Sequence, residues 1–464
     1  MTTTTLMSPV DVLLLAGEIG SRTLHIGALL VFGPSPDGTD TFAADAYRAA
    51  LDATSAQSAL MAQPVLSFAT AGLPTWQPAE RILMDRHLRR LALPSPGGDD
   101  ELFALVARLH ETRLDRSRPM WEGYLIEGLA GGRFALYGKI HHATLDGMSG
   151  IRMIEQSMDP DPQRRGMPLL LTPDEPEPTS DHRSRNPLRL VRDGISGAVA
   201  AADIVRHTAI GALDWLGKGV TTESTALPLS APRTVFDGKV GPDRAFVGKS
   251  WPKKRLRAIQ RATGATGNEV TLAMCAGALR SYLSAQGELP SKSLIALVPV
   301  AQRRREEAIG GNEFGLALCT LGTDLADPRA RLDRIRHSMA DAKRRVRAMG
   351  SSASMLASVP SLLPNVARIL PLGELLPPSY NVVISNVPGP KSPLYWNGAE
   401  LRHMYPLSIV FDGTGLNITI CHYADRLDFG FLANPESVPE LERFTDETET
   451  ALGDLERIQE VRST

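Results

Sequence analysis

The chain has 464 residues, a formal net charge of −2 at pH 7, 43% hydrophobic residues and 22% charged residues. One hydrophobic core rarely serves a chain of this length, so we expect two domains. The near-zero charge gives no overall attraction to nucleic acid. The sequence also has no basic patch with interleaved aromatic residues, so we expect no nucleic-acid partner.

The cysteines and the apolar segments indicate the cellular compartment in which the protein is expected. Three widely spaced cysteines form neither a disulfide framework nor a Cys-x-x-Cys metal motif; they are Cys275, Cys319 and Cys421. The first ten residues lack the basic and apolar regions of a secretory signal. No run of about 20 apolar residues predicts a membrane-spanning helix. We therefore expect a cytoplasmic protein in a reducing compartment.

Residues 1–158 predict a first domain of mixed α/β type. A dense apolar run between turn signals predicts a buried strand at 24–32. Apolar residues at steps of three and four predict helices at 43–53 and 102–114. Two apolar runs around Gly131 and Gly132 predict a hairpin of strands 124–129 and 134–140.

Residues 159–242 predict a linker. The part from 159 to 187 is rich in Pro, Asp and Arg, as loops are. An apolar stripe from Leu188 to Leu216 predicts one or two amphipathic helices. This stripe would pack between domains or contact a membrane or lipid droplet. A second apolar, Pro-broken stretch at 355–378 motivates the lipid hypothesis.

Residues 243–464 predict a second α/β domain. Pro252 and Gly264 are typical of the two ends of a helix. Apolar patterns predict further helices at 269–283 and 327–349, and strands at 245–251, 294–299, 380–385, 416–423 and 427–432. The predicted fold class is therefore α/β (α+β), with two lobes joined by a linker.

The clearest chemical signal is a pair of histidines at the end of a predicted strand, in His141-His142-Ala143-Thr144-Leu145-Asp146-Gly147. A neutral imidazole, with an ordinary pKa of about 6.5, can take the proton of an attacking alcohol. Adjacent strand residues point to opposite faces, so one histidine can face substrate while the other faces the protein. The same geometry argues against both binding one metal ion, and we expect no metal site.

The two residues that follow also fit this chemistry. Asp146 is placed to orient a ring or to pair with an arginine. Gly147 would let the backbone turn sharply, because it has no Cβ.

The pattern resembles the HHxxxDG motif of CoA-dependent acyltransferases with the chloramphenicol-acetyltransferase-like fold. Other segments resemble motifs of the bacterial wax ester synthase/diacylglycerol acyltransferase family, nearly from end to end of the chain. These are Ser8-Pro9-Val10-Asp11, Pro119-Met120-Trp121, Asn268-Glu269-Val270, Pro299-Val300 with Arg303 and Gly311-Asn312, Ser385-Asn386-Val387-Pro388-Gly389-Pro390, and Gly415-Leu416-Asn417-Ile418. Met120 replaces the family's Leu, Glu269 its Asp and Ala301 its Ser.

The resemblance implies two chloramphenicol-acetyltransferase-like lobes, each a mixed sheet with flanking helices. It implies that His142 is the base and that Asp146 is more often structural. Acyl-CoA would be a co-substrate, with no bound cofactor. A long-chain acyl group would pass directly to diacylglycerol or a long-chain alcohol, without an acyl-enzyme. Water-insoluble substrates would bring the protein to the inner membrane face or to lipid droplets.

Four further residues are candidates for substrate contact, each with an ordinary alternative. Pro119 and Trp121 belong to one motif, and a tryptophan such as Trp121 is more often a core residue than a ligand contact. Asn268 would serve equally as a helix N-cap. Asn386 lies in a turn-like run. Three other functions stay open: an acyltransferase for another hydroxylated lipid, a non-catalytic protein that binds acyl-CoA or a lipid surface, and a metal hydrolase.

Overall fold

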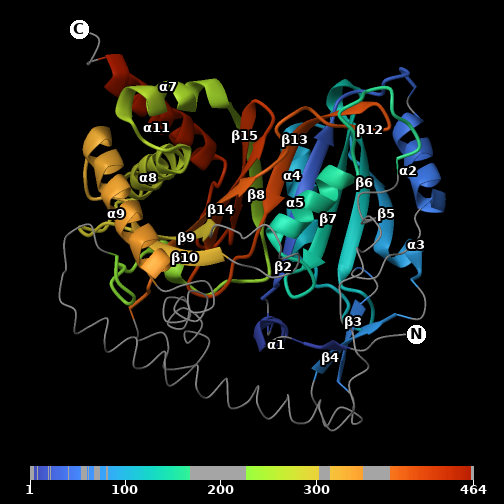
Figure 1. Ribbon diagram of the computed structural model, residues 1–464, viewed down its shortest axis with the longest axis horizontal. Helices are drawn as coiled ribbons and strands as arrows, with labels where there is room; N and C mark the ends of the chain where they lie inside the picture. Colours follow the sequence, from blue (N-terminus) through green and yellow to red (C-terminus); the bar gives the residue numbers. More distant parts are fainter. Residues whose placement is uncertain are drawn as a thin grey trace. The chain divides into compact units, whose positions relative to one another are not determined.

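The computed structural model describes residues 5–7, 9–18, 20, 22–39, 41–53, 60, 62–66, 74–79, 82–167, 226–301, 314–348 and 377–460. The chain divides into two compact units (Figure 1). The first unit comprises Met1–Asp203, Val387–Ile409 and Cys421–Ala424. The second comprises Ile204–Asn386, Val410–Ile420 and Asp425–Thr464. The predicted division into 1–158, 159–242 and 243–464 is linear along the chain, whereas these units interleave in the C-terminal part.

A six-stranded mixed sheet forms the centre of the first unit. Its order is β12 (Tyr395–Trp396), β13 (Ala399–Leu407), β2 (His25–Phe32), β7 (Arg133–His141), β6 (Trp121–Leu129) and β5 (Leu88–Ala92). Strands β5 and β6 are parallel, and the other neighbouring pairs are antiparallel. The predicted strands and hairpin are confirmed, and Gly131 and Gly132 take positive φ angles of 75° and 68° in its turn.

Helices and a small sheet complete the first unit. The helices are α1 (Pro9–Gly17), α2 (Phe42–Ala53), α3 (Met84–His87), α4 (Asp99–Glu111) and α5 (Gly147–Gln156), and the sheet order is β1 (Thr5–Leu6), β4 (Pro74–Pro78) and β3 (Ala62–Leu66). The helices predicted at 43–53 and 102–114 are thus present as α2 and α4, with ends that differ by up to three residues.

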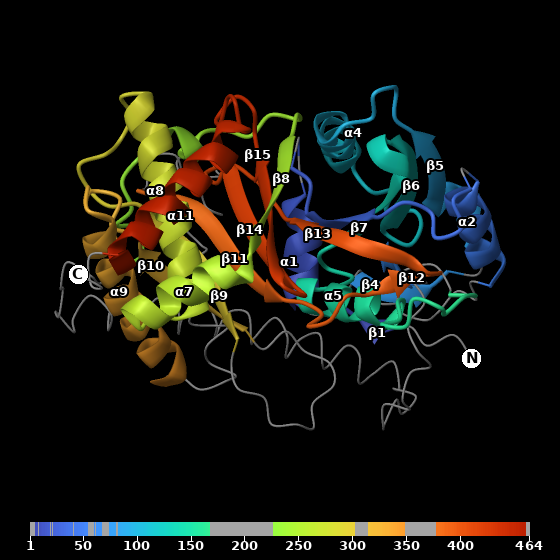
Figure 2. The ribbon, with the colours of Figure 1, turned by 90° about the horizontal axis from the view of Figure 1, so that it is seen from above.

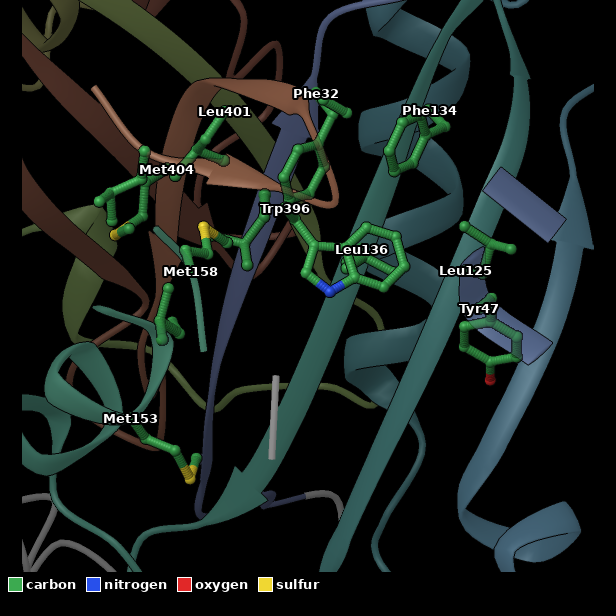
Figure 3. Close-up of a cluster of buried hydrophobic side chains, with 14 of the residues drawn as sticks. Phe32, Tyr47, Leu125, Phe134, Leu136, Met153, Met158, Trp396, Leu401 and Met404 are labelled. Carbon is green, nitrogen blue, oxygen red and sulfur yellow. The ribbon is translucent and has the colours of Figure 1, made fainter. Parts of the chain in front are cut away.

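The core of the first unit explains why a late segment belongs to it (Figure 3). Trp396 is fully buried, and its ring centroid lies 6.1 Å from those of Phe32 and Phe134. Met404 is also fully buried in this cluster. Residues near position 400 therefore fill the core beside a sheet whose first strand in the sequence, β2, begins at position 25.

The second unit contains another six-stranded sheet with helices. The sheet order is β10 (Phe314–Thr320), β9 (Ile295–Ala301), β11 (Val382–Pro388), β14 (Leu416–Tyr423), β15 (Arg426–Ala433) and β8 (Ala245–Pro252). Strand β9 pairs antiparallel with β10 and parallel with β11, so this sheet is mixed too. Figures 1 and 2 show that helices lie on one side of it, namely α7 (Lys253–Thr263), α8 (Gly267–Ala285), α9 (Pro328–Ala348) and α11 (Arg443–Glu460).

Helix α8 is buried over most of its length and packs closely on α11. A Cβ added to Gly277 would lie 2.5 Å from the Cβ of Ala451, so only glycine allows this approach. The predicted helix at 252–264 is present as α7, but Pro252 is its N-cap, not its first residue, and Gly264 ends it with a left-handed φ of 72°.

Some predicted segments lie outside the described residues. They are Ser8, the apolar stripe from Leu188 to Leu216, Arg303, Gly311-Asn312 and most of the stretch at 355–378. Within the parts that the structure describes, no helix is long and apolar enough to cross a membrane.

Candidate active site

The double histidine sits where β7 ends, between two neighbouring segments. The backbone N–H of His141 donates to the carbonyl of Met120 at 2.9 Å, and the N–H of His142 donates to the carbonyl of Leu24 at 2.9 Å. The Pro119-Met120-Trp121 segment, predicted from a different motif, therefore lies directly beside the histidines. Both histidines continue the hydrogen-bond ladder, which fixes their backbone.

Pro119 and Trp121 have the contacts of interior residues. Pro119 is buried, and its carbonyl accepts the N–H of Trp121 at 3.0 Å. The Trp121 indole N–H donates to the carbonyl of Leu60 at 2.9 Å, and its ring centroid lies 4.4 Å from that of His87. The contacts of Trp121 are thus those of a core residue, which was the alternative to substrate contact.

His141 is fully buried and bonds to the turn that follows it. Its Nδ1 accepts the N–H of Ala143 at 3.1 Å, so the neutral ring carries its proton on Nε2. That Nε2 lies 3.9 Å from Oε1 of Glu18. Burial lowers the pKa of His141 to about 4, although the Glu18 carboxylate acts in the opposite direction. His141 is therefore neutral at pH 7.

His142 is partly exposed, unlike its neighbour. Its Nδ1 is buried without a hydrogen-bond partner among the described residues. Burial lowers the pKa of His142 below its ordinary value, while its own carbonyl oxygen and the Asp146 carboxylate oppose this shift. A neutral, partly accessible imidazole can accept a proton near pH 7.

Asp146 is the N-cap of α5. Its Oδ1 accepts the backbone N–H of Ser149 at 2.9 Å, and its Oδ2 accepts the Ser149 hydroxyl at 2.9 Å. These contacts satisfy an otherwise unpaired N–H of the first helical turn. Neither the predicted ring contact nor an arginine pair is seen among the described contacts of Asp146, although its charge does act on His142.

Gly147 does not have the expected steric role. It is the first residue of α5, and a Cβ placed on it would have open space around it. It is also absent from the glycines with positive φ. The backbone turns at Asp146, in the extended conformation of a helix N-cap, so the turn needs no glycine.

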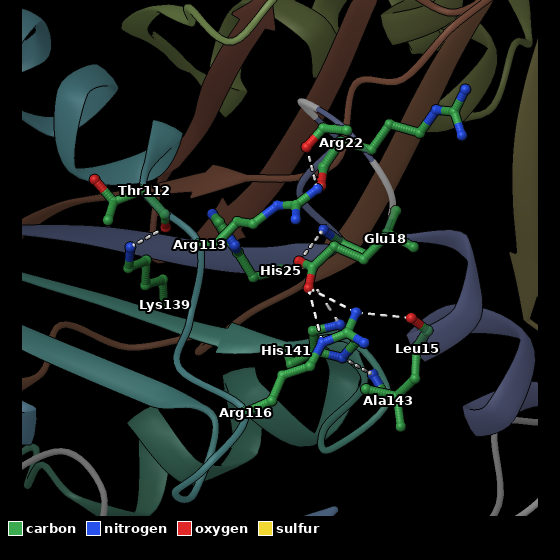
Figure 4. Close-up of polar contacts among 12 residues, drawn as sticks. Leu15, Glu18, Arg22, His25, Thr112, Arg113, Arg116, Lys139, His141 and Ala143 are labelled. Atoms are coloured by element: carbon green, nitrogen blue, oxygen red, sulfur yellow. Dashed lines mark hydrogen bonds and ion pairs between the residues drawn. The ribbon is translucent and has the colours of Figure 1, made fainter.

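Glu18 and Arg116, which the sequence did not single out, join the site (Figure 4). The Glu18 side chain is 2% exposed and pairs with the Arg116 guanidinium at 2.9 Å. Arg116 also donates to the carbonyl of Leu15 at 2.7 Å, and Arg113 donates to the carbonyls of Gly20 and Arg22. In the sequence, Glu18 is only a carboxylate that follows the apolar run before Gly17, and nothing local marks it as a site residue.

Lys139 is buried two residues before His141. Its ammonium donates to the carbonyls of Leu109 at 2.8 Å and Thr112 at 2.5 Å, and lies 3.2 Å from a carboxylate oxygen of Glu122. Leu109 and Thr112 lie at the C-terminal end of α4, where carbonyls lack helical partners. Lys139 thereby ties α4 to the strand that carries the histidines.

Two further histidines lie near this part of the sheet, His25 on β2 and His110 on α4. His25 pairs across the ladder with His141, and its Nε2 lies 2.7 Å from the carbonyl oxygen of His110. Nδ1 of His110 lies 2.7 Å from the hydroxyl of Tyr137. Burial lowers the pKa of His25 well below its ordinary value. No local sequence pattern connects these histidines, because their contacts are made only by the fold.

Asn268 and Asn386, the two candidates in the second unit, contact each other. The Asn386 amide donates to Oδ1 of Asn268 at 2.8 Å and to the Thr271 hydroxyl at 3.1 Å. Thr266, not Asn268, is the N-cap of α8, and Glu269 completes the capping box. The N-cap alternative for Asn268 is therefore wrong. The turn alternative for Asn386 is also wrong, because this residue lies in β11.

A pocket of about 570 Å³ lies along α5 in the first unit. Its lining combines apolar side chains with the cationic side chains of Arg152 and Lys391 and the anionic side chain of Glu155. The apolar lining includes Met148, Ile151, Met158 and Leu394. Within the described parts of the chain, no cluster of three or more His, Cys, Asp or Glu side chains could hold a metal ion.

Two mixed sheets with flanking helices, and a double histidine at a strand end, define an acyltransferase of the HHxxxDG type. The model of the wax ester synthase/diacylglycerol acyltransferase catalytic domain matches residues 7–271, and that of the WS/DGAT C-terminal domain matches residues 310–456. The chain therefore belongs to the wax ester synthase/diacylglycerol acyltransferase family, and it is an acyltransferase.

Relatives that match nearly the whole chain support the same family. A Mycobacterium tuberculosis protein with the provisional name diacylglycerol O-acyltransferase is 38% identical over 452 residues, which are 97% of this chain and 99% of that protein. A Mycobacterium bovis protein with the same provisional name is 37% identical over 454 residues, 95% of this chain and 88% of that protein.

Solved structures confirm the fold. The wax ester synthase/diacylglycerol acyltransferase from Marinobacter aquaeolei VT8 matches with a TM-score of 0.80 at 33% identity, covering 98% of this chain and 99% of that chain. A mutant starter condensation domain of rhizomide synthetase matches with a TM-score of 0.57 at 15% identity, covering 98% of this chain and 94% of that chain. The prediction of two chloramphenicol-acetyltransferase-like lobes is thus confirmed.

Proposed function

We propose that this acyltransferase moves a long-chain acyl group from acyl-CoA to the hydroxyl of diacylglycerol or of a long-chain alcohol, with His142 as the general base. The observation that carries the proposal is the contrast between the two histidines. His141 is fully buried and bonded to the protein, whereas His142 is partly exposed and has a lowered pKa. The family and the names of the relatives support the reaction class.

The proposed mechanism is a direct transfer. The alcohol oxygen attacks the thioester carbonyl while His142 accepts the alcohol proton. The C–S bond then breaks, and the imidazolium returns the proton to the CoA thiolate. Nδ1 of His142 is buried, which leaves Nε2 as the nitrogen that handles the proton. The reaction needs no resident cofactor and no acyl-enzyme.

The acceptor is proposed to be a water-insoluble lipid, so the protein would work at the inner face of the membrane or at lipid droplets. The pocket along α5 supports an amphiphilic substrate, because its lining combines apolar side chains with charged ones, of which two are cationic (Arg152 and Lys391) and one is anionic (Glu155). Its volume of about 570 Å³ lies within the range of roughly 300–1,000 Å³ for small-molecule sites. Acyl-CoA combines an apolar chain with anionic phosphates.

The test is CoA release from palmitoyl-CoA with diacylglycerol or hexadecanol, for the wild type and for His142→Ala. We expect acceptor-dependent release to fall at least about a hundredfold in the variant, as loss of a general base does. The better acceptor identifies the physiological reaction. Should the wild type release no CoA with either acceptor, another hydroxylated lipid or a binding role would replace this proposal. A His142→Ala enzyme with full activity would refute the base assignment.

A further inference from the structure

We infer that Glu18, held by Arg116, is a positioning residue for His142. This inference rests on the proposed role of His142 as the base. Glu18 touches neither the reacting atoms nor the His142 ring in any described contact. It acts instead on the backbone on both sides of His142, by two routes that start from the same carboxylate.

The first route passes through Leu24. Oε1 of Glu18 accepts the backbone N–H of Leu24 at 3.1 Å, and the carbonyl of Leu24 accepts the backbone N–H of His142 at 2.9 Å. One residue therefore connects the carboxylate to the backbone of the base. A shift of Leu24 would move the hydrogen bond that places His142.

The second route passes through His141. The same oxygen, Oε1 of Glu18, lies 3.9 Å from Nε2 of His141. A carboxylate there favours the proton on Nε2, which leaves Nδ1 free to accept the N–H of Ala143 at 3.1 Å. Glu18 thereby selects the ring form that closes the turn on the other side of His142.

Arg116 holds the carboxylate in this place. Its Nη2 and Nε donate to Oε2 of Glu18 at 2.9 Å and 3.3 Å, while Oε1 stays available for Leu24 and His141. Burying a carboxylate is costly without a well-oriented partner, and a two-point arginine contact offsets that cost. One carboxylate oxygen thus binds the arginine that holds Glu18, while the other contacts the segments beside His142, as a positioning group requires.

The surroundings keep this pair in place (Figure 4). Arg116 also donates to the carbonyl of Leu15, in the last turn of α1, and Arg113 binds the carbonyls of Gly20 and Arg22. Arg113 and Arg116 both follow α4, so this loop fixes the segment between α1 and β2. The segment carries Glu18 and leads into Leu24.

The test compares Glu18→Gln and Glu18→Ala with a matched control, Glu127→Gln. Glu127 also receives two donors from one arginine, Arg90, in the same unit, but has no described contact with the histidine segment. Displacing a catalytic group by about 1 Å can cost about a hundredfold in rate. We expect kcat to fall about a hundredfold in Glu18→Ala. Glu18→Gln keeps an oxygen for Leu24, so we expect a smaller loss, about tenfold.

Three readouts separate positioning from simple loss of structure. KM for both substrates should stay within about twofold, since the reacting geometry changes and the binding surface does not. Thermal unfolding should show a folded protein under assay conditions. Glu127→Gln should keep the wild-type kcat. If Glu18→Ala does not fold, Glu18→Gln and Arg116→Lys carry the test, because a lysine keeps the charge but loses the two-point contact.

The outcomes for Glu18 and for His142 are distinguishable. Wild-type kcat in folded Glu18→Ala or Glu18→Gln, together with an inactive His142→Ala, would overturn the positioning role and leave the proposed function intact. An active His142→Ala would remove the proposed function, and the inference about Glu18 with it. A raised KM at unchanged kcat in the Glu18 variants would assign Glu18 to substrate binding and also overturn the inference.

Discussion

Nδ1 of His141 accepts a hydrogen bond from the backbone N–H of Ala143 at 3.1 Å. The side chain of the first histidine therefore binds the residue that follows the second histidine. The carbonyl of His141 also accepts the N–H of Thr144 at 2.8 Å. Side chain and backbone of one residue therefore close the turn that presents His142. His141 thus stabilises the shape of the turn, and His142 is the residue proposed to take part in the chemistry.

An asparagine should replace His141 better than other residues do. Its Oδ1 can take the place of Nδ1 and accept the Ala143 N–H, whereas a leucine leaves that buried N–H without a partner, at a cost of about 1–3 kcal/mol. We expect His141→Asn to keep kcat within about tenfold and His141→Leu to lose about a hundredfold or more. Steady-state kinetics of the purified variants measures this. A His141→Asn enzyme as inactive as His142→Ala would show that the imidazole itself takes part in the reaction.

The pH dependence of activity should reflect the lowered pKa of His142. The base must be neutral, and burial moves its pKa below the ordinary value of about 6.5. We therefore expect the acid limb of kcat/KM to have its midpoint below that value. Kinetics between pH 5 and pH 8 reports it. A midpoint above about 6.5 would contradict the neutral, desolvated base.

Acid should destabilise the fold through His141. Its pKa is about 4 in the folded state, against about 6.5 when unfolded, so between these values the unfolded chain binds the proton and the folded chain does not. The contribution of His141 to stability is complete above about pH 6.5 and is lost as the pH falls toward 4. Thermal unfolding at pH 7 and pH 5 tests this. His141→Asn should lose less stability over that interval, and an equal loss would assign the effect to other groups.

Asp146→Asn separates the cap from the charge. Asparagine caps helices as well as aspartate does, so a purely structural Asp146 predicts kcat within about threefold and an unchanged unfolding temperature. Because the Asp146 carboxylate raises the pKa of His142, the acid limb of kcat/KM should move to lower pH in this variant. Asp146→Ala, which removes the cap, should cost about 1 kcal/mol of stability. A large loss of kcat in Asp146→Asn would give the charge a direct role.

The contact between α8 and α11 should tolerate no added atom at position 277. A Cβ there would lie 2.5 Å from that of Ala451, so Gly277→Ala should destabilise the second unit by about 1–3 kcal/mol through overpacking. Ala451→Gly should relieve the clash in the double variant. Chemical unfolding of the four proteins measures the coupling. Additive effects of the two substitutions would refute the contact.

Elements with a regular local pattern were predicted well from the sequence. Strands β2, β6 and β7 and helices α2, α4, α7, α8 and α9 follow from apolar spacing and from turn residues at their ends. Strands β10 and β13 and helix α11 were not predicted. Strand β13 pairs with β2 across more than 350 residues, and no local pattern reports such a partner.

The site shows the same division between local and long-range information. His141, His142 and Asp146 are found by spacing, because a short turn joins them. Glu18 and His25 reach the site only through the fold, and Asn268 meets Asn386 across more than 110 residues. Chemical reasoning predicts which residue types a site needs. Which individual residues of those types reach the site depends on the pairing of segments that are distant in the sequence.

Strand β13 also sets the order in which a newly made chain can complete its catalytic part. Without Ala399–Leu407, β2 would have an unpaired edge next to the strand that carries the histidines. The core would also lack Trp396 and Met404. The first 158 residues leave the ribosome early but cannot finish their own sheet. They must stay unaggregated until position 407 emerges, so a fragment that ends before it should not form a working half of the enzyme.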